Sequence, residues 1–280
     1  MARPGAEGDS AAMMNSRRQH FSPIAHLGDA TLRFVGDTGA MFLFLLESTG
    51  RIFSSLGQFR KTIQQIYFIG VKSLSVITLI GLFTGMVIGL QMHYALAKFG
   101  AEGFLGAAVA LSLVRELGPV LTAIMITGRA GSSMTAEIGV MRISAQVDAL
   151  RVMDINPIGY LVSPKLAASI ICFPILTAFF DLVGMAGGYL TGVLLLGGNG
   201  GTYTYRIQAY MKLSDVTGGF IKSLVFAVVV CTVCCFMGYY THTRRDAVGP
   251  EAVSQATTAG VVTSCILILL SDYILTSLLF

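Results

Sequence analysis

Two adjacent charged residues, Arg115 and Glu116, lie inside a long apolar stretch of the chain, 103–127. A charged side chain at mid-membrane costs about 2.5–3.5 kcal/mol on insertion scales, so such residues usually face a cavity or a charged partner. Two interpretations stay open. Either Arg115 pairs with a carboxylate of another span, Asp181 or Asp272, or the two charges form a polar spot in a substrate cavity.

Three nearby features bear on these charges. Gly118 and Pro119 follow directly, and proline inside a helix removes a hydrogen bond, so we expect a bend or break there. Asp181 stands alone in an apolar stretch and is expected to form a hydrogen bond with a neighbouring helix. Asp272 lies near the end of the last apolar stretch, where contact with water is expected.

The sequence contains no catalytic motif. It lacks GxxxxGK[ST], G-x-S-x-G and H-E-x-x-H, and the CxxC of Cys231 and Cys234 has no second ligand pair for zinc. We therefore expect no catalytic residue, no metal site and no cofactor in this chain. If ATP drives the protein, a separate chain must bind ATP and Mg²⁺ and hydrolyse the nucleotide.

The composition is that of an integral membrane protein. Of 280 residues, 54% are hydrophobic and only 12% are charged, and the mean hydropathy is +0.72. Soluble domains carry about 25% charged residues, so this composition rules out a disordered chain and argues against a soluble enzyme. The net charge of +4 is too small to indicate nucleic-acid binding.

Spanning helices need about 20 apolar residues each. Five stretches qualify: 73–92, 103–127, 161–196, 219–240 and 260–280. Residues 1–30 are expected to be disordered, and 31–65 are expected to form a helix in the membrane interface. A short amphipathic helix is predicted at about 137–150, between the second and third spans. The predicted fold is thus an all-α integral membrane protein with five transmembrane helices, an N-terminal interfacial helix and a cytoplasmic helix.

The Lys and Arg residues outside the spans gather on the side of the N-terminus. The opposite side has only Lys98, Arg206, Lys212 and Lys222. Because cytoplasmic loops carry the excess of basic residues, the N-terminus is predicted in the cytoplasm and the C-terminus outside.

Glycines recur every four residues in the first and third spans. They are Gly81, Gly85 and Gly89, and Gly184, Gly188 and Gly192. Such faces allow close approach of helix backbones. The contact could lie within one subunit or between two subunits.

The sequence resembles the MCE-associated ABC permease family, the permeases of the maintenance-of-lipid-asymmetry system. The resemblance is carried by Ala110-Leu-Ser-Leu-Val-Arg-Glu-Leu-Gly-Pro-Val-Leu-Thr-Ala, Gly128-Arg-Ala-Gly-Ser, Ala136-Glu-Ile-Gly-Val-Met, Gln146-Val-Asp-Ala-Leu, Gly85-Met-Val-Ile-Gly-Leu-Gln and Ala256-Thr-Thr-Ala-Gly-Val-Val. It extends from about residue 65 to the end of the chain.

The resemblance implies a homodimeric permease subunit in a bacterial inner membrane. Two cytoplasmic ABC ATPase subunits would dock on the loop after the second span, whose helix would be the coupling helix. A hexameric MCE-domain ring would lie on the periplasmic side, and phospholipid would occupy a cavity at the dimer interface. The complex would move phospholipids between the inner membrane and the ring.

The resemblance also implies two sets of site residues. The lipid-binding set is Leu90, Gln91, Tyr94, Arg115, Glu116 and Asp272. The ATPase-coupling set is Glu137, Ile138, Met141, Arg142, Gln146 and Asp148. The chain departs from the family pattern at Ala145, where Glu is frequent, and at Asn156 and Gly159, where Asp and Arg are frequent.

Two rival functions belong to other classes. One is an ATP-independent channel or secondary carrier that uses Arg115, Glu116 and Asp272 as an ion relay. The other is a scaffold that anchors the ring without transporting lipid.

Overall fold

The computed structural model describes residues 23–51, 59–241 and 249–279, and these residues form helices and short connections without a strand. The chain divides into two compact units, 1–43 and Phe44–Phe280. The first unit contributes most of α2 (Pro23–Gly50), and the second contains every other described helix. The helices of the second unit are α3 (Phe59–Ile69), α4 (Leu74–Ala97), α5 (Leu105–Ser112), α6 (Gly118–Ile126), α7 (Ser132–Ile143), α8 (Gln146–Val152), α9 (Pro157–Leu161), α10 (Ser163–Tyr189), α11 (Gly200–Tyr210), α12 (Leu213–Tyr239) and α13 (Pro250–Leu279).

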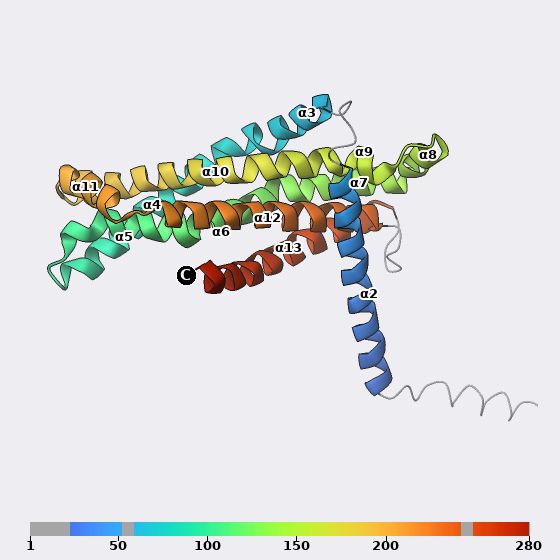
Figure 1. The fold of residues 1–280 in the computed structure, drawn as a ribbon, viewed down its shortest axis with the longest axis horizontal. Helices are drawn as coiled ribbons and strands as arrows, with labels where there is room; N and C mark the ends of the chain where they lie inside the picture. Colours follow the sequence, from blue (N-terminus) through green and yellow to red (C-terminus); the bar gives the residue numbers. More distant parts are fainter. Residues whose placement is uncertain (1–22, 52–58, 242–248, 280) are drawn as a thin grey trace, which may run out of the picture. The chain divides into compact units, whose positions relative to one another are not determined.

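Five helical runs are long and apolar enough to cross a membrane, which confirms the predicted all-α membrane fold. They are Phe59–Ala97, Glu102–Ile143, Pro157–Leu195, Leu213–Tyr239 and Pro250–Leu279. Figure 1 shows these runs lying roughly alongside one another in the second unit, with α8 and α9 at one end and α5 and α11 at the other.

The N-terminal boundaries differ from those expected. The expected interfacial helix at 31–65 corresponds to parts of α2 and α3, and α3 leads through a short 3-10 turn (Val71–Ser73) into α4. Of the segment expected to be disordered, 1–22 lie outside the described residues, and 23–30 form the first turns of α2. Basic and aromatic residues at the start of α3 therefore begin the first membrane helix.

The expected break at Gly118-Pro119 is replaced by a local change of helix type. A π-helical turn, Leu113–Leu117, lies between α5 and α6, and the N–H of Gly118 bonds to the carbonyl of Leu113. Proline is tolerated at the start of a helix, and Pro119 stands in the first turn of α6. The second span consequently continues past the proline as one helical run.

The glycine faces of the first and third spans pack against each other within one subunit. A Cβ added to Gly85 would lie 1.9 Å from the carbonyl oxygen of Gly184, and one added to Gly89 would lie 3.1 Å from the Cα of Gly188. Helices α4 and α10 run together along this contact. Of the two interpretations left open, packing within the subunit is therefore the one that the structure confirms.

The helix expected at about 137–150 is divided into two. Helix α7 continues the second span to Ile143, and α8 begins at Gln146 after a left-handed residue, Ala145, with φ 58°. A left-handed backbone cannot continue a right-handed helix, so the chain turns at this residue. The family departure at Ala145 thus lies at the turn between the two helices.

Candidate functional site

A fully buried lysine in the fourth span, Lys222, holds the predicted charges together. Its Nζ lies 2.6 Å from Glu116 Oε2 and 3.0 Å from Asp272 Oδ1, and it donates to Thr276 Oγ1 at 2.7 Å. Thr276 Oγ1 in turn lies 3.1 Å from Glu116 Oε1. Lys222 therefore joins the second, fourth and fifth spans, and it brings together Glu116 and Asp272, two members of the predicted lipid-binding set.

Pro119 explains a fourth contact of this lysine. In an α-helix the carbonyl of Arg115 would accept from the N–H of Pro119, which proline lacks. Lys222 Nζ donates to this carbonyl at 2.9 Å. The ammonium group thus satisfies a backbone oxygen that the proline leaves without its usual partner, in addition to two carboxylates.

Arg115 pairs with a carboxylate that the sequence analysis did not single out. Its Nη2 lies 2.8 Å from Asp215 Oδ1, and its Nε donates to the same oxygen at 2.9 Å. The expected partners, Asp181 and Asp272, were wrong for this arginine. Asp215 stands in the first turn of α12 and also accepts from the backbone N–H of Lys212, so its position is set by the helix start.

Lys222 was also placed wrongly among the basic residues outside the membrane. It lies in the interior of α12 and is 0% exposed. One signal was present in the sequence: Asp215 and Lys222 are seven residues apart, which puts them on one face of a helix. Two opposite charges on one face of an apolar helix indicate a buried polar contact.

The ion cluster, defined as Arg115, Glu116, Asp215, Lys222 and Asp272, is buried on one side only. The side chains of Asp215 and Lys222 are 2% and 0% exposed, whereas those of Arg115 and Glu116 are 40% and 39% exposed. The cluster therefore presents a cation and a carboxylate at the surface of the subunit, within its membrane-spanning part.

The other residues of the predicted lipid-binding set lie on α4. Leu90, Gln91 and Tyr94 are all exposed at the subunit surface. Their role in lipid binding stays a prediction.

The predicted ATPase-coupling residues fall into two groups. Ile138 is fully buried against the fourth span near Gly238, so its side chain holds α7 in place within the subunit. Gln146 and Asp148 are exposed on α8. The coupling role itself stays a prediction.

Ion pairs tie the loop helices to the spans. Glu137 Oε2 lies 2.5 Å from Nζ of the buried Lys165 on α10. Arg142 Nη1 lies 2.6 Å from Asp148 Oδ1, which joins α7 to α8 across the turn. Arg151 donates to Tyr239 Oη at 2.6 Å, and this hydrogen bond raises the pKa of the arginine.

A groove lies beside this group of ion pairs. Glu137 and Met141 of the predicted coupling set line it together with Lys61 and Lys165, around a volume of about 240 Å³. The predicted coupling residues thus flank a hollow as well as an exposed helix, α8.

Asn156 has a structural role that accounts for one departure from the family pattern. Its Oδ1 accepts from the N–H of Gly159 at 3.0 Å and caps α9, while its Nδ2 donates to Glu47 Oε1 at 2.7 Å. The amide does both at once because it offers an acceptor and a donor.

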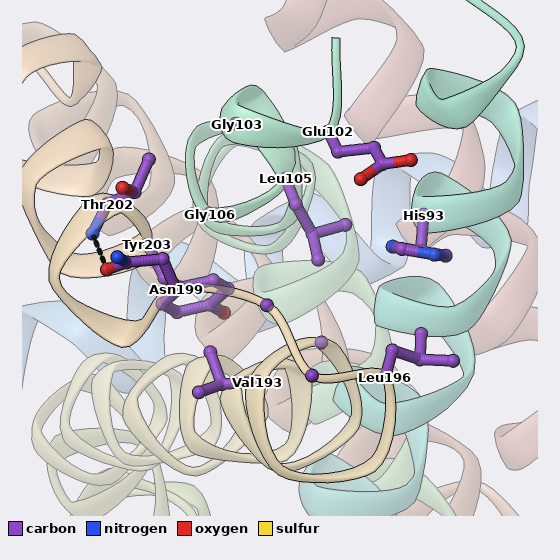
Figure 2. Close-up of a pocket in the computed structure, with 13 residues that line it drawn as sticks. His93, Glu102, Gly103, Leu105, Gly106, Val193, Leu196, Asn199, Thr202 and Tyr203 are labelled. Atoms are coloured by element: carbon purple, nitrogen blue, oxygen red, sulfur yellow. Dashed lines mark hydrogen bonds between the residues drawn. The ribbon is translucent and has the colours of Figure 1, made fainter. Parts of the chain in front are cut away.

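The opposite end of the second unit also holds a pocket of about 240 Å³. Figure 2 shows His93 and Glu102 on one side of it and Asn199, Thr202 and Tyr203 on the other. Tyr203 donates to the carbonyl of Met185 at 3.0 Å, and burial raises the pKa of its hydroxyl to about 12. This pocket shares no lining residue with the ion cluster.

Among residues 23–51, 59–241 and 249–279, no group of three His, Cys, Asp or Glu side chains is arranged to hold a metal ion. The chemistry that the described polar residues offer is ion pairing and hydrogen bonding inside the membrane region.

The family model described as "Permease MlaE" matches residues 62–278 of the chain. The chain belongs to the MlaE permease family. The match covers nearly all of the five spans and both groups of candidate site residues, so the ion cluster and the loop helices are parts of an MlaE-family permease.

Individual relatives support the same family. This MlaE-family permease is 42% identical over 219 residues to the "Intermembrane phospholipid transport system permease protein MlaE" of Haemophilus influenzae, covering 78% of this chain and 82% of the relative. It is 40% identical over 254 residues to a "Probable ABC transporter permease protein" of Rickettsia bellii, covering 91% and 96%. It is 34% identical over 230 residues to "Protein TRIGALACTOSYLDIACYLGLYCEROL 1, chloroplastic" of Arabidopsis thaliana, covering 82% and 64%.

Proposed function

We propose that this chain is the membrane subunit of an ABC transporter that moves phospholipids between the inner membrane and an MCE-domain ring. Membership of the MlaE family and the name of the Haemophilus relative, an intermembrane phospholipid transport permease, support this proposal. The observation that carries it is the half-exposed ion cluster. Lipid tails cannot solvate Arg115 and Glu116, so a polar ligand or a partner must cover them.

The chemistry of Arg115 suits a phospholipid headgroup. A guanidinium group presents a planar fork of N–H donors that matches phosphate oxygens. Asp215 orients this fork through contacts with Nε and Nη2, and the side chain is still 40% exposed. Phosphate would approach from this exposed side, and Glu116 and Asp272 would confine it there by repulsion.

A second copy of the chain would enclose this site. Only 11% of an apolar 18-residue stretch of α13 is buried within the subunit, whereas 61% of the corresponding stretch of α12 is buried. The fifth span carries Asp272 of the ion cluster, so pairing of two subunits along this side would cover both the helix and the charges. The homodimer is thus part of the proposal.

The energy source and the remaining partners lie on other chains. The absence of a phosphate-binding loop from the sequence leaves ATP and Mg²⁺ to two cytoplasmic ATPase subunits. Helix α8, with exposed Gln146 and Asp148, and the groove at Glu137 and Met141 form the surface on which they would dock. The hexameric MCE ring would lie at the periplasmic side.

The experiment is reconstitution of the complex between donor and acceptor vesicles, with labelled phospholipid followed with and without ATP. The critical variant combines Arg115→Gln with Asp215→Asn, because removing the arginine alone would leave Asp215 buried and unpaired. We expect this double variant to assemble normally and to lose bound phospholipid and transport. Arg206→Gln, a charge change outside the ion cluster, is the matched control.

Three results would contradict the proposal. Normal lipid content and transport in the double variant would show that Arg115 is not part of the substrate site. Lipid movement that needs no ATP would favour a carrier, and a complex without bound lipid or transport would favour a scaffold.

A further inference from the structure

Another, mainly apolar cavity lies between α10 and α12, and Val114 of the second span is part of its lining. Its volume is about 240 Å³, and it is lined by apolar side chains that include Leu182, Met185 and Phe220. Leu182 and Phe220 are 64% and 44% exposed, so the cavity opens at the membrane-facing surface of the subunit. It shares no lining residue with the ion cluster.

Two buried polar groups point to a ligand in this cavity. Thr177 and Asp181 both line it and are only 4% and 7% exposed. Neither Thr177 Oγ1 nor Asp181 Oδ1 has a hydrogen-bond partner among the described residues. This corrects the expectation that Asp181 bonds to a neighbouring helix. A buried polar atom without a partner costs about 1–3 kcal/mol, so a group that supplies the missing bonds would be stabilised there.

The backbone around Asp181 leaves room for its carboxyl group. A Cβ added to Gly118 would lie 1.9 Å from Asp181 Oδ1. The carboxyl group therefore lies directly against the backbone of the second span. It occupies the space that the side chain of any residue larger than glycine at position 118 would need. Its position is set by the packing of α10 on this span.

The depth of the cavity matches the glycerol region of a bilayer. Helix α12 has 27 residues, which at 1.5 Å per residue is about 40 Å, close to the full thickness of a bilayer with its headgroups. Val216 and Phe220 line the cavity and are the fourth and eighth residues of α12. This places the cavity about 5–10 Å below the start of the helix, where headgroups give way to hydrocarbon.

We propose that this cavity binds a monoacyl glycerolipid, with its free glycerol hydroxyl donating to Asp181 and its ester carbonyl accepting from Thr177. A cavity of about 240 Å³ is smaller than the pockets of about 300–1,000 Å³ that enclose drug-sized ligands, so it would hold the glycerol region while the acyl chain extends into the bilayer. A monoacyl phospholipid keeps a free glycerol hydroxyl, which a diacyl phospholipid lacks. A carboxylate next to a phosphate is repulsive, so the headgroup would extend outward past Leu182. The site depends on the membrane location of the chain and not on its transport activity.

The test is photo-labelling of the full chain in phosphatidylethanolamine vesicles without any ATPase. Two probes carry the same diazirine-bearing acyl chain: lysophosphatidylethanolamine and diacyl phosphatidylethanolamine. We expect the lyso probe to label the segment of Leu182 and Met185 at least fivefold more than the diacyl probe. Ile175, exposed on α10 outside the cavity, reports the background of bilayer contact.

Variants separate the hydrogen bonds from the fold. Thr177→Val and Asp181→Leu should each lower labelling about fivefold, the effect of one hydrogen bond of net strength near 1 kcal/mol. Asp181→Asn, which keeps an acceptor, should retain it. Thr217→Val is the matched control, because this threonine already bonds to the carbonyl of Leu213 outside the cavity. Elution as a single species and thermal unfolding would verify that each variant is folded.

Equal labelling by the two probes, or labelling that Thr177→Val and Asp181→Leu leave unchanged, would overturn the assignment. Because the experiment contains no ATPase and measures no transport, its failure is distinct from a failure of the proposed transport function. Competition by unlabelled monoacylglycerol would show whether the glycerol unit alone or the phosphate headgroup is recognised, and both outcomes require the hydroxyl contact with Asp181.

Discussion

At the scale of single residues, Lys222 determines how the membrane-buried charges are arranged. A lone ammonium group in a span is costly, and this one is matched by Glu116, Asp272, Thr276 and the carbonyl of Arg115. Buried ion pairs contribute little net stability, but removing one partner leaves an uncompensated charge. The cluster is therefore sensitive to any change that removes only one of its charges.

Replacing Lys222 by methionine should destabilise the subunit strongly. The substitution keeps an unbranched side chain that is one atom shorter, but it leaves Glu116 and Asp272 close together without a cation, at a cost of about 3–5 kcal/mol. Thermal unfolding in detergent would measure the loss, and Lys98→Met, at an exposed helix end, is the control. Adding Glu116→Gln should restore part of the stability, and an unchanged unfolding temperature in Lys222→Met would contradict the role of the lysine.

At the scale of helices, close backbone approach determines the packing of α4 on α10. A Cβ added to Gly85 would lie only 1.9 Å from the carbonyl oxygen of Gly184, well inside van der Waals contact. Protein interiors are packed too tightly to absorb such an overlap without moving a helix. The position of the first span, which carries Leu90 and Tyr94, thus depends on a glycine about one and a half to two and a half turns away.

Gly85→Ala should lower the stability of the chain by about 1–3 kcal/mol, the usual cost of overpacking. Gly128→Ala is the matched control, since no atom lies within 4 Å of its added Cβ. Comparing the unfolding temperatures of the two variants in detergent would measure the difference. Equal stability would mean that α4 and α10 can separate without cost, contrary to the packing described.

The pair of loop helices depends on the contact between Arg142 and Asp148. Reversing the charge with Asp148→Arg would put two cations at the turn between α7 and α8 and would move α8. We expect weaker co-purification with the ATPase and lower ATP hydrolysis by the complex. Glu102→Lys, at the opposite end of the second unit, is the control, and an intact, active complex with Asp148→Arg would remove α8 from the docking surface.

At the scale of the whole molecule, α13 is long and apolar enough to cross the membrane once between Pro250 and Leu279. Such a crossing would place its two ends on opposite sides of the membrane. Removing Lys222 from the outer residues strengthens the predicted charge bias, because only Lys98, Arg206 and Lys212 remain on that side.

A reporter fused after Phe280 should therefore be active in the periplasm, and a reporter inserted next to Gly249 should be active in the cytoplasm. Paired fusions to a periplasmic and a cytoplasmic reporter enzyme would measure both sites. Activity of the two fusions on the same side would contradict the crossing of α13, and reversed activities would contradict the orientation.

The sequence alone determined the membrane class, the five spans and the family. These follow from properties read along the chain: the length of apolar stretches, their charge content and contiguous motifs such as 110–123. It also identified Arg115 and Glu116 as the charges that need an explanation. A charged residue within a long apolar stretch of sequence lies on an apolar helix once that stretch folds.

Only the tertiary structure decided which charge meets which. Asp215 lies 100 residues from Arg115, and Lys222 lies 106 residues from Glu116. The rotation of each helix about its axis and its position along the membrane normal bring these residues together, and their spacing in the sequence does not. The same packing leaves Thr177 and Asp181 without partners beside a cavity, a fact that no local pattern encodes. A hydrogen bond acts over about 3 Å, and distances on that scale between remote segments arise only when the helices pack.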